Sequence, residues 1–437
     1  MKITNIRKRN GEVRPFDLSK ITHAVAKALK ATETGGKPEA EAIAQATLKH
    51  TEAMCALAQT PGSNEHEEGV CKDGFPTVEE IQDIVERTLM EFNYFDTAKA
   101  YILYRNDRNR LRARDLFSKR STLKPYEYPE LASYVDAIPL SNWIHTEFNY
   151  TGDIQDFKTN VTEPERQAIK KSMLAIAQIE VAVKLFWGNL YHKIPKPEIG
   201  AVGATFAESE VRHMDAYSHL LEILGLNEDF STLRSVPVIQ ERIEYLDKVN
   251  ALAQANENRV YSQAVLLFSL FVEHVSLFSQ FLIIMSFNKH RNLFKGISNA
   301  VEATSKEEQI HGLFGIDLIN IIRTEHPEWF DETQSKEVRA MSIEAFQAES
   351  QIVDWIFADG EPDFLSAVEV KEFIKQRLNN SLVSIGITPV FSVDTALVEK
   401  TEWFDDEVIA TKQVDFFDKR SINYNKRQSS VTGDDLF

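Results

Sequence analysis

The chain has 437 residues, 43% of them hydrophobic, so it can bury a large core and is long enough for two or three domains. Its formal charge of -17 would repel nucleic-acid phosphates, so polymeric nucleic acid is not expected as a partner. The first residues carry charges without an apolar run behind them, which indicates neither a signal peptide nor a transit sequence. We therefore expect a cytoplasmic protein.

Residues 1–106 form the first predicted domain, a small α/β module. Alternating residues surround Asn10-Gly11, a dipeptide that suits a tight turn, so short strands are expected there. Helical periodicity follows at residues 18–57 and 78–110, with a loop at about 60–75. Cys55 and Cys71 are the chain's two cysteines, too few for a disulfide framework or a Cys-rich zinc site. We expect both to be free thiols.

The remainder is predicted to be almost wholly helical after a linker at residues 107–139. Long helical runs span residues 163–190, 199–224, 262–288 and 296–324, with further helices at 335–358 and 363–381. These runs predict a helix bundle over residues 140–410, followed by a polar, flexible tail at 411–437. The apolar stretch from Ala264 to Phe287 has Glu273 and His274 near its middle, so it predicts a buried helix and no membrane span.

Two Glu-x-x-His motifs, Glu210 with His213 and Glu308 with His311, are candidate metal ligands within the bundle. Residues three apart lie on one face of a helix, so each pair can direct two donors to one place. The spacing alone is weak evidence, because a chain with 11 histidines would contain about one such motif by chance. The simpler interpretation is a polar helix surface.

Two further glutamates, Glu180 and Glu273, lie inside apolar runs and favour the metal site. Burying an ionised carboxylate costs several kcal/mol unless it is paired or binds a metal, and no basic residue lies within a helical turn of Glu273. With the two motifs they supply four carboxylates and two imidazoles, the ligand pattern of dinuclear sites in helix bundles. Oxygen and nitrogen donors without thiolate suit iron or manganese. His274 points elsewhere and is interpreted as a core histidine.

In their order, these ligands resemble those of the radical-generating β subunit of class I ribonucleotide reductase, over most of residues 140–437. The resemblance implies a ferritin-like bundle in which Glu180, Glu210 and His213 bind one metal ion. Glu273, Glu308 and His311 would bind the other, with some carboxylates bridging. The family's commonest di-iron members have Asp where this chain has Glu180, so dimanganese is favoured, with di-iron and Mn/Fe as alternatives.

Four more residues fall at positions where the family has functional side chains. Tyr217 resembles the tyrosine that stores a radical, although a metal pair can also store the oxidising equivalent. Trp143 resembles the tryptophan that passes this equivalent to the surface, and Glu307 stands where an Asp commonly links that tryptophan to a metal-bound histidine. Tyr424, in the tail, resembles the tyrosine that relays the radical between subunits. Core packing is the simpler explanation for Tyr217 and Trp143.

The resemblance also implies how the chain acts. The reaction of ribonucleoside-diphosphate reductase needs cysteines, and residues 107–437 have none, so the large α subunit would supply them. The C-terminal tail would dock on that subunit, and the chain would form a homodimer.

Residues 1–106 resemble the ATP-cone, a nucleotide-sensing domain, through Ile6 to Gly11, Phe16-Asp17, Lys20-Ile21 and Tyr101 to Arg105. A basic cluster there suits phosphate, although on charge alone a solvated basic hairpin would be the favoured interpretation, and only the ordered match of several positions reverses it. The resemblance implies that ATP permits activity and that dATP suppresses it, through a higher oligomer. The residues implied in nucleotide binding are Lys8, Arg9 and Lys20 for the phosphates, with Ile6, Asp17 and Ile21 around the base and sugar.

Two other functions fit parts of the sequence. A stand-alone ferritin-like dimetal oxidase would use the same six ligands but would need neither Trp143, Tyr424 nor a docking tail. A nucleotide-binding regulatory protein would use the N-terminal module and keep the bundle only as structure.

Overall fold

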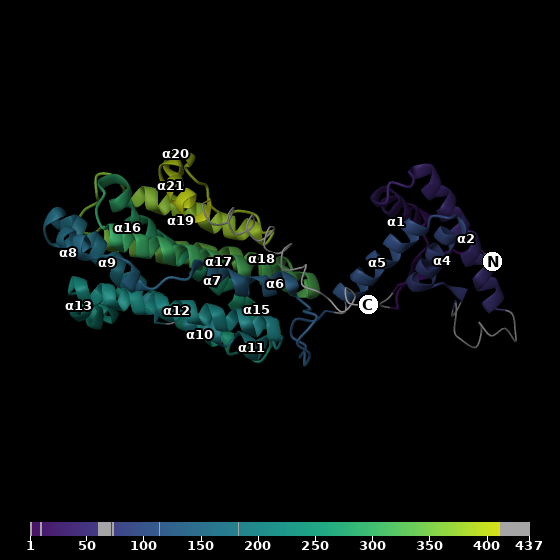
Figure 1. Cartoon of the computed structure of the whole chain (residues 1–437), viewed down its shortest axis with the longest axis horizontal. Coiled ribbons are helices and arrows are strands. Elements are labelled where there is room, and N and C mark those ends of the chain that lie inside the picture. The colour runs from purple at the N-terminus through teal and green to yellow at the C-terminus, as the bar shows by residue number, and fades with distance from the viewer. Residues whose placement is uncertain are drawn as a thin grey trace, which may run out of the picture. The chain divides into compact units, whose positions relative to one another are not determined.

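The computed structural model describes residues 2–8, 11–59, 71, 74–112, 114–181 and 183–410. The chain divides into two compact units, Met1–Arg114 and Asp115–Phe437. The first unit is coloured purple to blue in Figure 1, and the helices of the second run from blue through teal to yellow. The predicted mainly helical class is confirmed, and the strands among the described residues are two short ones near the N-terminus.

The described residues of the N-terminal unit form a β-hairpin and four helices. Strands β1 (Asn5–Arg7) and β2 (Val13–Pro15) pair antiparallel, with Ile6 opposite Arg14. Gly11 has a φ of +83°, a value that glycine adopts without strain, so the expected turn is confirmed at this residue. Asn10 lies outside the described residues. The helices are α1 (Leu18–Ala31), α2 (Lys37–Ala58), α4 (Val78–Glu91) and α5 (Phe95–Arg112).

Each of the two predicted helical stretches of this unit is divided into two helices. The first ends at Ala31 and resumes at Lys37, after Gly36, whose N–H donates to the Glu39 carboxylate at 2.8 Å. The second breaks around Asn93, which has a φ of +62°. Periodicity continued across both breaks because the flanking helices bury residues against one shared core, including Val25, Leu29, Ile43, Ile81 and Leu89.

The prediction that Cys55 and Cys71 are free thiols is wrong for this structure. Cys55, near the end of α2, forms a disulfide with Cys71, and their Cα atoms lie 5.3 Å apart. The backbone N–H of Cys71 also donates to the Glu80 carboxylate at 3.0 Å, which fixes Cys71 beside the start of α4. Both cysteines are buried. Their separation of 16 residues in the sequence gave no indication of this contact.

The C-terminal unit is a bundle of long helices that lie side by side (Figure 1). Helix α12 packs against α9 and α17, and α16 packs against α9 and α17. Their apolar faces form one continuous core. The long helices are α9 (Glu163–Glu180), α12 (Pro197–Leu224), α14 (Pro237–Ala253), α16 (Phe278–Arg291), α17 (Lys295–Glu325), α18 (Glu332–Ile356) and α19 (Ala367–Ser384).

Two of the predicted long runs are interrupted at points that matter for the site. The first helix ends at Glu180, and α10 (Lys184–Gly188) and α11 (Leu190–Lys193) follow it. The third run comprises α15 (Asn258–Leu267), a π-helical segment η6 (Phe268–Ser276) and then α16. π-Helical turns inside longer helices frequently occur at functional sites. The stretch Asn258–Arg291 is apolar enough to span a membrane, but its most apolar window is wholly buried in the bundle.

Short elements complete the second unit. Part of the segment predicted as a linker belongs to the bundle, because Tyr128 and Leu131 are fully buried and Arg120 pairs with Glu198 at 2.8 Å. The short elements are α6 (Pro129–Ala132), η2 (Ser133–Asp136), α7 (Ala137–Ser141), η3 (His145–Glu147), α8 (Thr151–Gln155), η4 (Asp156–Asn160), α13 (Asn227–Thr232), η5 (Leu233–Ser235), η7 (Pro327–Trp329), α20 (Thr395–Val398), η8 (Glu399–Thr401), α21 (Glu402–Asp405) and η9 (Asp406–Ala410).

Candidate metal centre

The bundle brings all six predicted metal ligands together from four helical segments. Glu180 is the last residue of α9, and Glu273 lies in η6. Helix α12 carries the first Glu-x-x-His motif and α17 carries the second, so each helix directs two donors inward. Each side chain of the set is at most 1% exposed: Glu180, Glu210, His213, Glu273, Glu308 and His311.

Two carboxylates lie between the two histidines. The Nδ1 atom of His213 lies 2.9 Å from Glu308 and 3.5 Å from Glu210. The Nδ1 atom of His311 lies 3.0 Å from Glu210 and 3.3 Å from Glu308. Glu210 and Glu308 therefore each approach both imidazoles, as bridging carboxylates would. Glu273 lies 3.6 Å from His311, and Glu180 groups with His213 and Glu308.

These donor atoms fit a pair of metal ions. Both carboxylate oxygens of Glu180, Glu210 and Glu308 are buried without a hydrogen bond, as are the Nδ1 atoms of both histidines. Burial raises the pKa of Glu180 and that of Glu273 well above the usual carboxyl value, because water no longer stabilises the charge. Buried carboxylates with unpaired oxygens are stable as anions only if cations meet them. Two divalent ions would neutralise the four carboxylates.

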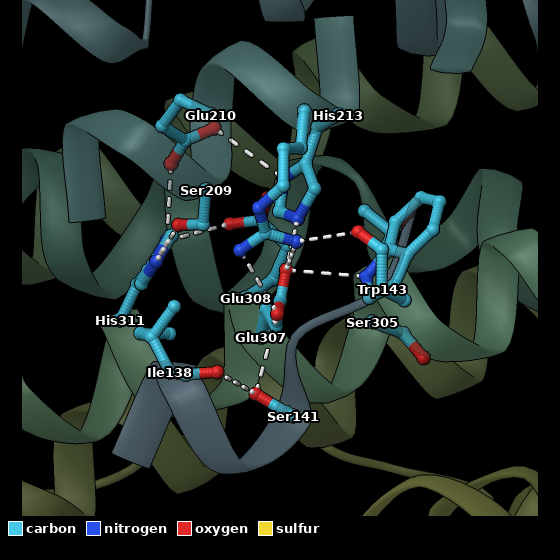
Figure 2. Close-up of polar contacts among 12 residues, drawn as sticks. Ile138, Ser141, Trp143, Ser209, Glu210, His213, Ser305, Glu307, Glu308 and His311 are labelled. Atoms are coloured by element: carbon cyan, nitrogen blue, oxygen red, sulfur yellow. Dashed lines mark hydrogen bonds and ion pairs between the residues drawn. The ribbon is translucent and has the colours of Figure 1, made fainter. Parts of the chain in front are cut away.

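The outer nitrogen of each histidine has a partner that fixes the ring. Nε2 of His213 lies 2.7 Å from the Glu307 carboxylate, and Nε2 of His311 lies 3.0 Å from the Ser209 hydroxyl (Figure 2). A histidine that binds metal commonly donates its other N–H to such a group, which sets the tautomer and the orientation of the ring. Both imidazoles are therefore oriented with Nδ1 toward the carboxylates.

Glu307 connects the centre to Trp143. The Trp143 indole Nε1 donates to Oε2 of Glu307 at 3.2 Å, and Figure 2 shows the carboxylate between the indole and His213. The rings of Trp143 and His213 are stacked, with centroids 5.9 Å apart and planes inclined by 19°. Trp143 is 4% exposed. The longer side chain of glutamate thus reaches both partners that the family resemblance assigned to an aspartate.

Tyr217 lies on α12 one turn beyond His213 and is buried. Burial raises the pKa of its phenol far above the usual value, and the nearby Glu180 carboxylate raises it further. Its hydroxyl makes no hydrogen bond of good geometry to any residue that the structure describes. Tyr217 is therefore a neutral phenol close to the predicted centre.

His274 is a core histidine, as predicted. Its Nδ1 lies 2.6 Å from the Ser381 hydroxyl on α19, so its polar atom is satisfied outside the ligand cluster. Burial lowers the pKa of His274 well below the usual value, and the nearby Arg377 guanidinium acts in the same direction.

Sequence reasoning missed four residues around the ligands: Ser141, Trp187, Ser209 and Arg212. Ser141 and Arg212 hydrogen-bond to Glu307, and the Trp187 indole donates to Glu273 at 2.8 Å. Ser209 and Arg212 directly precede the ligands Glu210 and His213, which is the one signal that could have identified them. Trp187 follows Glu180 by seven residues, in the run predicted as one helix at residues 163–190, and we did not single it out because an aromatic residue there fits core packing.

The predicted nucleotide-binding residues lie in the N-terminal unit. Ile6 is in β1, Lys8 follows it, and the Lys8 N–H donates to the Glu12 carbonyl at 2.8 Å. The Asp17 carboxylate caps α1 by accepting from the Ser19 N–H at 3.0 Å, and Lys20 and Ile21 lie in the first turn of that helix. Ile21 is buried, whereas Asp17 and Lys20 are exposed. Arg9, Tyr424 and the predicted docking tail lie outside the described residues.

Residues 120–400 match the family described as "Ribonucleotide reductase, small chain", and residues 4–110 match the ATP cone domain. The chain belongs to the ribonucleotide reductase small chain family. It is 25% identical over 334 residues to the probable ribonucleoside-diphosphate reductase small subunit 048L of Invertebrate iridescent virus 3, which covers 73% of this chain and 87% of that protein.

Solved structures show the same ferritin-like fold. Streptococcus sanguinis dimanganese(II)-NrdF aligns with a TM-score of 0.56 at 16% identity, covering 65% of this chain and 99% of the other. An R2-like ligand-binding oxidase with an Mn/Fe cofactor aligns with a TM-score of 0.51 at 18% identity, covering 60% of this chain and 94% of the other. These similarities confirm the predicted fold class.

Proposed function

We propose that this chain generates and stores the oxidising equivalent for ribonucleotide reduction, and that a separate large subunit carries out the reduction. The observation that carries the proposal is the contact of Glu307 with both His213 and Trp143, at 2.7 and 3.2 Å. This contact connects a buried ligand cluster to an indole beside it. A protein that only stored metal would have no need of it.

The proposed cofactor is a dimanganese centre, with di-iron and Mn/Fe as alternatives. The oxygen and imidazole donors suit either metal, and Glu180 in place of the commoner aspartate favours manganese. Glu180, Glu210 and His213 would hold one ion, and Glu273, Glu308 and His311 the other, with Glu210 and Glu308 shared. The bound and oxidised metal pair would supply the oxidising equivalent. Tyr217 would store it as a radical in the di-iron form, whereas in a manganese form the metal pair itself can store it and Tyr217 can stay reduced.

Trp143 is proposed to lose one electron inward to the oxidised centre and to regain one from the partner subunit. Glu307 would keep its hydrogen bond to the indole N–H during this exchange. Tyr424 would relay the electron between the subunits, and the tail at 411–437 would dock on the partner. The described residues of the second unit include no cysteine, so the partner would also supply the thiols.

The ATP-cone is proposed to regulate this activity, with ATP permitting it and dATP suppressing it. Lys8, Arg9 and Lys20 would bind the phosphates, and Ile6, Asp17 and Ile21 would surround the base and sugar. The active form would be a homodimer in the cytoplasm, and dATP would drive a higher oligomer. The Lys20→Gln variant should raise the dATP concentration needed for half-inhibition about tenfold, because the substitution removes about one charge-assisted hydrogen bond to the nucleotide. Lys27→Gln, an exposed lysine on the same helix, is the matched control.

Reconstitution with a large subunit tests the main proposal. The metal-loaded chain should support formation of deoxyribonucleotides, and a chain that ends at Ile422 should bind the same amount of metal but support none. Undiminished reduction by the shortened chain would refute the proposed docking. Electron paramagnetic resonance of the activated protein would show a sharp tyrosyl signal for di-iron and a multiline coupled signal for manganese.

A stand-alone dimetal oxidase is the second candidate, favoured by the similarity to the R2-like ligand-binding oxidase. If the chain is such an oxidase, it should oxidise a small substrate in a metal-dependent reaction without any partner. Removal of the tail should not change the rate of that reaction. A nucleotide-binding regulatory protein predicts less than one tightly bound metal ion per chain after reconstitution. Metal analysis separates these outcomes.

A further inference from the structure

Arg212 contacts both Trp143 and Glu307 through one guanidinium group. Its Nη1 donates to the Trp143 carbonyl at 3.1 Å and to Oε2 of Glu307 at 3.2 Å, and its Nη2 donates to Oε1 at 3.3 Å. The side chain is 10% exposed, and that of Glu307 is fully buried. Among the described residues, the basic groups paired with this carboxylate are the Arg212 guanidinium and the His213 imidazole.

The arrangement solves a geometric problem that glutamate creates. A glutamate side chain has one more rotatable bond than an aspartate side chain, so its carboxylate can adopt more conformations. Here Oε2 accepts from Trp143, His213 and Arg212 together, and Oε1 accepts from Ser141 at 3.2 Å and from Arg212. The planar guanidinium matches a carboxylate with two parallel donors, which fixes both its position and its plane.

Arg212 also spans three parts of the bundle. It extends from α12 beside the ligand His213, pairs with Glu307 on α17, and holds the backbone of Trp143 between α7 and η3. Its Nε donates to Glu208 one turn earlier on α12, at 3.0 and 3.1 Å to the two oxygens. Glu208 is exposed and, in the described part of the chain, forms no hydrogen bond or ion pair with Glu307 or Trp143, so it contacts the guanidinium only from outside.

We propose that Arg212 is a positioning residue that holds the Glu307 carboxylate and the Trp143 indole in register, and so sets the rate at which Trp143 exchanges electrons with the centre. This inference rests on the proposed function and deepens it. Arg212 acts through Trp143 and Glu307 and need not touch the metal. The bidentate fork is required, because a lysine ammonium has its donors at a single point and cannot hold two carboxylate oxygens and a carbonyl together.

The test compares Arg212→Gln, Arg212→Lys and the control Glu208→Gln in the full-length chain. The first readout is independent of activity: after chelation of metal, the indole N–H signals of the five tryptophans are followed by NMR, with Trp143→Phe assigning the relevant one. In both Arg212 variants the Trp143 indole proton should exchange with solvent at least about tenfold faster, because each variant loses charge-assisted hydrogen bonds that hold Glu307 against the indole. Glu208→Gln should leave it unchanged.

The second readout is deoxyribonucleotide formation with a large subunit after metal loading. The Arg212 variants should bind as much metal as the unsubstituted chain but support reduction at least about tenfold more slowly. Unchanged exchange and unchanged reduction in Arg212→Gln would overturn the inference. If Arg212→Lys showed the same indole exchange rate and the same rate of reduction as the unsubstituted chain, the proposed need for a bidentate guanidinium would be refuted. If the unsubstituted chain supports no reduction, the proposed function fails, while the NMR comparison still decides whether Arg212 positions Trp143.

Discussion

The indole Nε1 of Trp187 donates to Oε1 of the predicted ligand Glu273 at 2.8 Å, and both side chains are fully buried. This bond leaves one oxygen of Glu273 facing His311. Partners of this kind orient a ligand, and their loss typically weakens metal binding by about 10- to 100-fold. We predict this loss for Trp187→Phe, measured by competition with a chelator. Trp329→Phe, which replaces a tryptophan stacked on His326, should leave the affinity unchanged.

Glu308 approaches both histidines and is therefore expected to matter for both metal ions. Glu308→Ala should reduce the metal content from about two ions per chain to less than about one, since a bridging carboxylate neutralises both cations. Elemental analysis after reconstitution measures this. Glu302→Ala on the same helix removes a half-exposed partner of Lys306 and should keep the full content. Retention of two ions by Glu308→Ala would contradict the bridging role.

Tyr217→Phe separates storage on the metals from storage on the tyrosine. If manganese stores the equivalent, the variant should support reduction within about twofold of the unsubstituted chain, since the lost hydroxyl makes no hydrogen bond of good geometry among the described residues. A di-iron protein would lose its activity and its sharp resonance signal together. The two measurements on one sample decide the case.

The Cys55–Cys71 disulfide closes a short loop in the N-terminal unit. A closed loop of about 15 residues stabilises a fold by about 3 kcal/mol, mainly by restricting the unfolded chain. The double variant Cys55→Ser with Cys71→Ser should therefore lower the free energy of unfolding of this unit by about 2 to 3 kcal/mol in denaturant titrations. Reduction of the unsubstituted protein should reproduce the loss and should not affect the double variant. Two titratable thiols in the unreduced, native protein would contradict the pairing.

Tyr101 provides a prediction at alkaline pH. Burial raises the pKa of its phenol from 10.0 to about 12 in the folded protein, although the nearby Arg105 opposes this shift. The folded state therefore favours the neutral phenol, and the stability that this contributes is complete below pH 10 and lost as the pH rises toward 12. The absorbance difference between the unsubstituted chain and Tyr101→Phe should titrate near pH 12 when folded and near pH 10 in denaturant. A folded-state midpoint near 10 would show that Tyr101 is exposed.

The six side chains that the structure brings together could be singled out from the sequence because their signals are local. Glu210 and His213 share a helix face, and Glu180 and Glu273 stand out as charges within apolar runs. Trp187 and Arg212 were missed because each meets its partner across the bundle, 86 and 95 positions away in the chain. Neither contact changes the hydrophobic periodicity of the sequence. The disulfide was missed for the same reason, since pairing depends on how α2 packs and not on spacing.

The π-helical segment around Glu273 has a consequence for how related chains can vary. A π-helical turn holds about one residue more than an α-helical turn, so this stretch can be regarded as an α-helix that has absorbed a single inserted residue. Deleting one residue there would let the helix close into regular α geometry. The flanking helices would keep nearly the same register, and the side chains within the π-helical turns, Glu273 among them, would be the ones redirected. The backbone hydrogen bonds of this helix would therefore permit a segment that is one residue shorter. The direction of the Glu273 side chain would not permit it, so the position of Glu273 in the cluster fixes the length of this segment.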